Sequence, residues 1–84
     1  MEGFSFESKS LGYGIIEFEI CNYYDMGWAE SSNFMEIEPN RPGQSITIMT
    51  TKGSITCYVS AYQKKDSENY IVNVNAVSIK RNRR

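Results

Sequence analysis

The stretch Ile55-Thr56-Cys57-Tyr58-Val59-Ser60-Ala61-Tyr62 decides the fold class, because apolar or small side chains occupy every second position. Successive side chains of a β-strand point to opposite faces of a sheet, so this period of two predicts a strand with one buried face. Ile46-Thr47-Ile48 and residues 70–79 repeat the pattern on either side. Near Ala76-Val77 the apolar positions change parity, which predicts a β-bulge or a second core contact there.

The segments between these runs predict hairpins. Thr51-Lys52-Gly53-Ser54 has a glycine where a tight turn needs positive φ, so residues 45–51 and 54–62 should pair antiparallel. The polar loop 64–69 should join the strand at 54–62 to the strand at 70–79 as a meander. Residues 39–43 contain two prolines and Gly43, which predicts a further turn.

The N-terminal half extends the alternation to Phe4–Glu7 and to Ile16-Glu17-Phe18-Glu19-Ile20, which we interpret as a half-buried strand. Residues 11–14 should form the corner between these two strands. Residues 25–33 predict a loop with at most one helical turn, followed by a short strand at Phe34–Ile37. The expected fold is all-β, a small antiparallel barrel or sandwich of five to six short strands with little helix.

A chain of 84 residues has room for one domain, which we place at 1–79, with 80–84 as a basic C-terminal tail. The first residues lack the basic start and apolar run of a secretory signal, and no apolar run is long enough for a transmembrane helix, so we expect a cytoplasmic protein. The strand faces predict a core of Ile16, Phe18, Ile20, Ile46, Ile48, Ile55, Val59, Val72 and Val74.

The two cysteines are expected to be reduced and unlinked, as is usual in a cytoplasmic chain. The strand faces on which the two cysteines are expected also argue against a disulfide. Cys57 shares a face with Ile55 and Val59, whereas Cys21 would share a face with Glu17 and Glu19. A bulge would be needed to bring the two thiols together.

The charge of the chain is divided between its two halves. Residues 1–42 contain eight carboxylates against Lys9 and Arg41, a formal charge of −6, and residues 43–84 contain seven basic side chains against Asp66 and Glu68, a formal charge of +5. The net charge of −1 conceals this asymmetry. Charge asymmetry bears on partners and on long-range steering rather than on fold, and it suggests a surface that meets another macromolecule.

The sequence offers little for catalysis. It contains no histidine, which excludes triads with a histidine base and histidine-containing metal sites. Cys57 lies on an apolar strand face with nothing to activate a thiolate. Glu17 and Glu19 are spaced like paired carboxylates, but the solvated face of an amphipathic strand is the better explanation for them. We expect no enzyme, no catalytic residues, no cofactor and no metal.

Two sets of residues are candidates for binding. Aromatic side chains beside carboxylates are typical of protein–protein hot spots, although the tryptophan could also fold back over the end of a barrel. The protein-binding candidates are Tyr23, Tyr24, Asp25, Trp28, Glu17 and Glu19. Exposed tyrosines beside positive charge are typical of single-stranded nucleic-acid binders, although the tyrosines could cover a second core layer and the basic end could be a solubilising tail. The nucleic-acid candidates are Tyr58, Tyr62, Lys64, Lys65, Lys80, Arg81, Arg83 and Arg84.

The sequence therefore favours a small non-enzymatic protein-binding module whose partner is another protein. A specific version is an inhibitor of a nucleic-acid-handling or defence enzyme encoded by a mobile element, because carboxylates can occupy positions where phosphates would bind. The alternative is a single-stranded nucleic-acid-binding small β-barrel that uses Tyr58, Tyr62 and the basic tail. No membrane partner is expected, and a homo-oligomer paired through strand edges is a further option.

Overall fold

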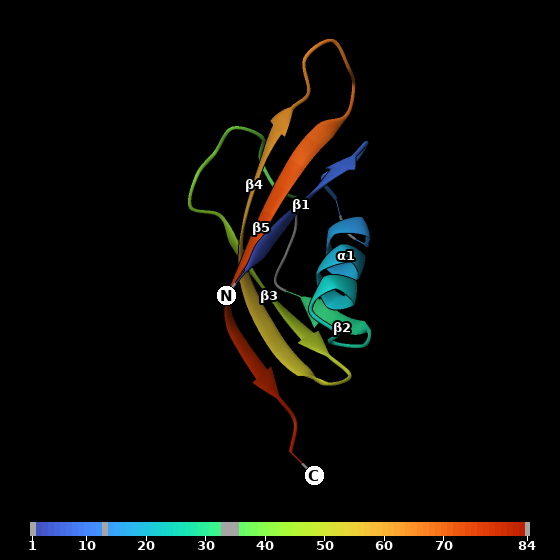
Figure 1. The fold of residues 1–84 in the computed structure, drawn as a ribbon, viewed down its shortest axis with the longest axis vertical. Helices are drawn as coiled ribbons and strands as arrows, with labels where there is room; N and C mark the ends of the chain where they lie inside the picture. The colour runs from blue at the N-terminus through green and yellow to red at the C-terminus, as the bar shows by residue number, and fades with distance from the viewer. Residues whose placement is uncertain (1, 13, 33–35, 84) are drawn as a thin grey trace.

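The fold is one open antiparallel sheet with one helix on its face (Figure 1). The computed structural model describes residues 2–12, 14–32 and 36–83. Its elements are β1 (Gly3–Ser8), α1 (Ile15–Tyr23), β2 (Ala29–Ser32), β3 (Ser45–Thr50), β4 (Gly53–Gln63) and β5 (Tyr70–Arg81). The strand order is β1-β5-β4-β3-β2. The predicted small all-β fold of five to six strands with little helix is confirmed, with five strands in the described residues, where the sheet is not closed into the expected barrel.

The core lies between α1 and the face of the sheet that α1 covers. Strand residues at alternate positions are buried there, as the period of two predicted, and they meet the apolar side chains of the helix. The fully buried members include Ile16, Ile20, Met26, Ile46, Ile48, Ile55, Val59, Val72 and Val74. Because β4 and β5 have 11 and 12 residues, they extend beyond the helix and give the molecule its elongated shape of 49 × 20 × 19 Å.

The two predicted hairpins are present. β3 pairs with β4 from Ser45↔Tyr58 to Thr50↔Gly53, and β4 pairs with β5 from Gly53↔Arg81 to Gln63↔Tyr70. Gly53 has φ +139°, and a Cβ atom there would lie 1.9 Å from the carbonyl oxygen of Lys80. This close approach explains why the turn requires glycine.

The predicted parity change in β5 is a β-bulge. Thr56 pairs with Ser78 but Cys57 pairs with Ala76, so Val77 has no partner on β4. The extra residue returns Ile79 to the core side, opposite Ile55, and leaves Val77 exposed on the other face.

The strand predicted at residues 16–20 is wrong, because this segment is the helix α1. Ile16, Ile20 and Tyr24 are four residues apart and so follow one face of a helix as well as one face of a strand. Phe18 belongs to the strand face but not to the helix face, and it is 54% exposed rather than part of the core. Helix formation is assisted by Glu17, whose carboxylate accepts a hydrogen bond from the N–H of the N-cap residue Gly14 at 2.8 Å.

Three further boundaries differ from the predictions. Residues 25–33, expected as a loop, contain the short edge strand β2. Of the strand expected at Phe34–Ile37, residues 34 and 35 lie outside the described residues, and Glu36 and Ile37 are not in a strand. Lys80 and Arg81, expected in a tail, pair with Ser54 and Gly53 as the end of β5.

The change from strand to helix also moves Cys21. Cys21 lies in the core with Cys57 instead of facing away from it, and both cysteines are free and buried. Within the described ranges, no helix is long and apolar enough to cross a membrane.

Candidate functional site

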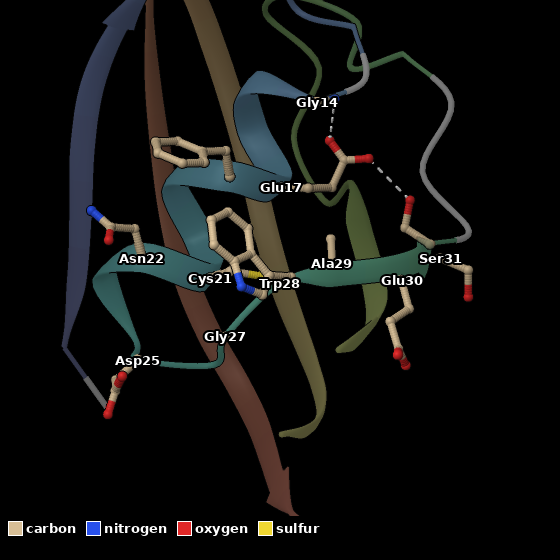
Figure 2. A pocket seen from close by; sticks show the side chains of 12 residues that line it. Gly14, Glu17, Cys21, Asn22, Asp25, Gly27, Trp28, Ala29, Glu30 and Ser31 are labelled. Carbon is tan, nitrogen blue, oxygen red and sulfur yellow. Dashed lines mark hydrogen bonds between the residues drawn. The ribbon is translucent and has the colours of Figure 1, made fainter. Parts of the chain in front are cut away.

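A groove of about 770 Å³ lies between α1 and the segment from Asp25 to Ser32 (Figure 2). Phe18 and Cys21 contribute from the helix, and Trp28 contributes from the loop that precedes β2. Figure 2 shows the indole of Trp28 in front of Cys21, between the helix and the start of β2. Trp28 is 70% exposed, although tryptophan is normally well buried in a folded protein, so this side chain marks the groove as a candidate binding site.

Glu17 fixes one end of the groove. Its carboxylate accepts hydrogen bonds from the N–H of Gly14 at 2.8 Å and from the hydroxyl of Ser32 at 3.1 Å. The residue is 6% exposed, so its side of both contacts is buried, and the two hydrogen bonds are partly shielded from water. Glu17, a predicted partner contact, therefore ties the start of α1 to β2 and sets the width of the groove.

The backbone of Trp28 is held in place by the β3–β4 turn. The N–H of Trp28 donates to Oγ1 of Thr51 at 3.1 Å, and the N–H of Thr51 donates to the carbonyl oxygen of Trp28 at 3.0 Å. Gly27 has φ +76°, and a Cβ there would lie 2.2 Å from the same Oγ1. The indole is thus displayed from a rigid segment, which lowers the entropy cost of binding.

The groove is acidic. Its lining includes the carboxylates of Glu17, Asp25 and Glu30 and no lysine or arginine. Asp25 forms an exposed ion pair with Lys52 at 3.2 Å, a kind of pair that contributes little to stability and exchanges readily. Glu30 forms no ion pair within the part of the chain that the structure describes. The site can therefore accept a cationic group.

Tyr23 and Tyr24, two of the predicted protein-binding residues, contact residues near the start of the chain instead of the groove. The ring of Tyr23 stacks on Phe4 with centroids 4.2 Å apart, although the side chain stays partly exposed. The hydroxyl of Tyr24 donates to the carbonyl oxygen of Glu2 at 2.8 Å, and burial raises the pKa of this tyrosine. Glu19 is partly exposed and does not line the groove.

The nucleic-acid candidates are not brought together. Lys64 and Lys65 lie in the β4–β5 loop, and Lys80 and Arg81 lie at the other end of β5, about 35 Å away for a strand of this length. Lys64 pairs with Glu7 at 3.1 Å. The guanidinium of Arg81 donates to the carbonyl oxygens of Tyr24 and Asp25. Arg83 is exposed, and Arg84 lies outside the described residues.

Tyr58 and Tyr62 are exposed, as predicted, on the face of the sheet that carries no helix. They lie four positions apart on β4, so their Cα atoms are about 13 Å apart. Met49 and Val77 are also exposed large apolar side chains of these central strands. This face is a mixed apolar surface without a basic cluster.

The two thiols lie at and below the floor of the groove. Cys21 lines the groove, and burial raises its pKa. Burial and, secondarily, the proximity of Cys21 raise the pKa of Cys57 to about 12. Both thiols are therefore protonated and unreactive at neutral pH. In the described residues no three Cys, Asp or Glu side chains form a group that could hold a metal ion.

Comparison with models of known protein families, with curated proteins and with solved structures finds no match for this chain. The site consequently stands on its geometry. Of the predicted protein-binding residues, Glu17, Asp25 and Trp28 line the groove, whereas Tyr23, Tyr24 and Glu19 do not. Sequence reasoning missed Phe18 and Glu30. The four-residue spacing of Ile16, Ile20 and Tyr24 is compatible with a helix that exposes Phe18, but it fits a strand as well, so the sequence carried no decisive signal for this residue.

Proposed function

We infer that this chain is a protein-binding module that uses the groove between α1 and β2. The observation that carries this conclusion is the exposure of Trp28, next to a second exposed aromatic side chain, Phe18, in a groove rimmed by carboxylates. Aromatic side chains that lose water on contact dominate the binding energy of protein interfaces. The fixed backbone at Trp28 supports the same conclusion, because a rigid anchor loses little entropy on binding.

The inhibitor version extends this proposal. The N-terminal half, with a formal charge of −6, supplies α1, the loop after it and both edge strands, β1 and β2. Of its carboxylates, those of Glu17, Asp25 and Glu30 line the groove, where they would meet a basic nucleic-acid-binding surface and speed association with it. A cytoplasmic location belongs to the same proposal, since both cysteines are free thiols.

Retention of a partner from an extract of the source cells tests the proposed function. The immobilised full chain is compared with Trp28→Ala and with Tyr62→Ala, a control that removes an exposed aromatic side chain from the other face of the sheet. We expect the same identified protein to be retained, after nuclease treatment, by the parent chain and by Tyr62→Ala, and to be lost with Trp28→Ala. Equal retention by all three chains, or the retention of no protein, would contradict the proposal.

Nucleic-acid binding on the open face of the sheet is the second candidate. The exposure of Tyr58 and Tyr62 favours it, since exposed rings stack on the bases of single strands. The separation of the basic side chains weakens it, because affinity for nucleic acid depends on the number of phosphates neutralised. A titration with a mixed single-stranded oligonucleotide at physiological salt tests it. Binding that Tyr58→Ala and Tyr62→Ala abolish and that Trp28→Ala preserves would favour this function.

A further inference from the structure

We propose that the outer edge of β2 receives an extended segment of a second protein as an added β-strand, and that this segment carries alternating basic and apolar side chains. The inference rests on the protein-binding function proposed above and gives that same groove a binding mode. Strand addition is a common way of recognising peptides, in which backbone hydrogen bonds provide affinity and side-chain contacts provide specificity.

The groove follows the edge of β2 rather than one of its faces. All four residues of the strand, Ala29 to Ser32, line the groove. Because successive side chains of a strand point to opposite faces, a hollow on one face would contact only alternate residues. Contact with four consecutive residues indicates that the backbone edge borders the groove. The lining residues include none from β1, the other edge strand.

The outer edge of β2 carries backbone N–H and C=O groups with which an added strand can pair. Among the residues that the structure describes, β2 is the last strand in the sheet order and pairs only with β3. Ala29, Glu30 and Ser31 have no backbone hydrogen bond, within the described part of the chain, to any segment other than β3. An incoming strand can therefore pair with their outward-facing N–H and C=O groups, which are otherwise left to water.

The side chains around this edge specify a basic partner. The carboxylates of Asp25 and Glu30 lie on the groove with no basic residue among its lining. A lysine or arginine of the added strand can pair with either carboxylate or lie over the face of the exposed indole of Trp28. An apolar side chain at the alternate positions would contact Phe18 on the helix side. The complementarity is therefore to an extended segment with basic and apolar residues in alternation.

The same charges argue against a second copy of this chain. Pairing two β2 strands would bring the Glu30 side chains of both copies onto one short ladder, and like charges on neighbouring strands are destabilising. The register of β2 also shifts between Ala29 and Ser31, which limits the length of regular edge available to a flat partner sheet. The occupant is accordingly a different protein, and its charge is the feature that selects it.

A synthetic peptide with blocked ends and the sequence Arg-Val-Arg-Val-Arg-Val provides the probe. Trp28 is the one tryptophan of the sequence, so its fluorescence reports directly on the groove. We expect the peptide to change this fluorescence, to shift the amide resonances of residues 29–32 and to slow their hydrogen exchange. Glu30→Lys should weaken binding about tenfold, because it exchanges an attraction for a repulsion. The matched control Glu68→Lys, in the β4–β5 loop, should bind like the parent chain.

Two control peptides make the proposal falsifiable. A version with N-methyl groups on alternate amides loses the donors needed for pairing, and a Glu-Val version reverses the charge, so neither should bind. No shift at residues 29–32 at millimolar Arg-Val peptide, or equal binding of the N-methylated peptide, would overturn strand addition. Concentration-dependent dimerisation that shifts the amide resonances of residues 29–32 without added peptide would also overturn it, in favour of a second copy. If Trp28→Ala still loses the partner from the extract in any of these cases, the binding function stands and only its mode is wrong.

Discussion

The hydroxyl of Tyr24 accepts a hydrogen bond from the backbone N–H of Ala76 at 3.2 Å, and so joins the end of α1 to the centre of β5. The same hydroxyl donates to the carbonyl oxygen of Glu2. In the β1–β5 register the last pair is Gly3 opposite Asn75, so Glu2 and Ala76 stand at the next position, just beyond the end of that ladder. The tyrosine therefore bridges the position where the ladder stops, one residue before the bulge at Val77. The two hydrogen bonds of this hydroxyl therefore connect the end of α1 with the residue before β1 and with the residue before the bulge in β5.

Tyr24→Phe should lower the free energy of unfolding by about 1–3 kcal/mol, because it leaves a partly buried N–H of Ala76 without its acceptor. Tyr23→Phe is the matched control, since its hydroxyl makes one long, exposed contact with the carbonyl oxygen of Gly3 at 3.4 Å. Urea unfolding followed by circular dichroism measures both variants. Equal losses in the two variants would show that the Tyr24 hydroxyl is not a specific tie.

Phe18→Ala should change the free energy of unfolding by less than about 0.5 kcal/mol, because this side chain is largely exposed on the groove. Ile20→Ala, two residues later on the same helix, should cost about 2–5 kcal/mol, because Ile20 is fully buried. In a strand that buried Phe18 beside Ile20, both substitutions would be strongly destabilising and the contrast would disappear. Thermal melts of the two variants decide between the arrangements, and a large loss for Phe18→Ala would contradict the helix.

The central strands of the sheet could be predicted from the sequence, but the helix α1 and the edge strand β2 could not. β3, β4 and β5 have long alternating patterns and a glycine turn, so their pairing and even the bulge could be predicted from residues 45–79. In α1, Ile16 and Ile20 satisfy both a period of two and a period of four, and β-branched residues favour the strand interpretation. The helix is favoured because, as a helix, this segment packs Ile16 and Ile20 against the core face of the sheet. β2 has no apolar signal at all, since Ala29–Ser32 is strand only through its pairing with β3.

Only part of the candidate site could be predicted for the same reason. Trp28 and Asp25 were recognisable from their residue types in a loop. Phe18 lines the groove because α1 directs its side chain outward, and Glu30 lines it because β2 is an edge strand. Neither element was predicted, so neither residue was recognised. The hydroxyl of Tyr24 contacts Glu2 and Ala76, which lie 22 and 52 positions away in the sequence. No local pattern could therefore have shown that Tyr24 does not belong to the binding surface.

Glu7 should titrate below the ordinary glutamate pKa. Its carboxylate accepts hydrogen bonds from the amide of Asn69 at 2.6 Å and from Lys64 at 3.1 Å, and these two contacts lower its pKa in that order of importance. Since the pKa is lowered on folding, the contribution of Glu7 to stability is present above its unfolded pKa and is lost as the pH falls through the folded value. Carboxyl-detected NMR titration should therefore show the pKa of Glu7 rising toward the ordinary glutamate value in Asn69→Ala and in Lys64→Ala. An unchanged pKa of Glu7 in either variant would contradict the contribution of that contact.

The Cys57 thiol should be inert toward alkylation in the native protein at pH 8. Burial, with Cys21 nearby, raises its pKa from 9.0 to about 12, so almost no thiolate is present at that pH. Above pH 9 the unfolded state releases the Cys57 proton, whereas the folded state keeps it. The contribution of Cys57 to the free energy of unfolding is therefore fully present below pH 9 and is lost as the pH rises toward 12. Urea unfolding between pH 8 and pH 11 should therefore show a steeper loss for the parent chain than for Cys57→Ala, in which this thiol does not titrate. Iodoacetamide labelling of Cys57 in the native chain at the rate of an exposed cysteine would contradict its place in the core.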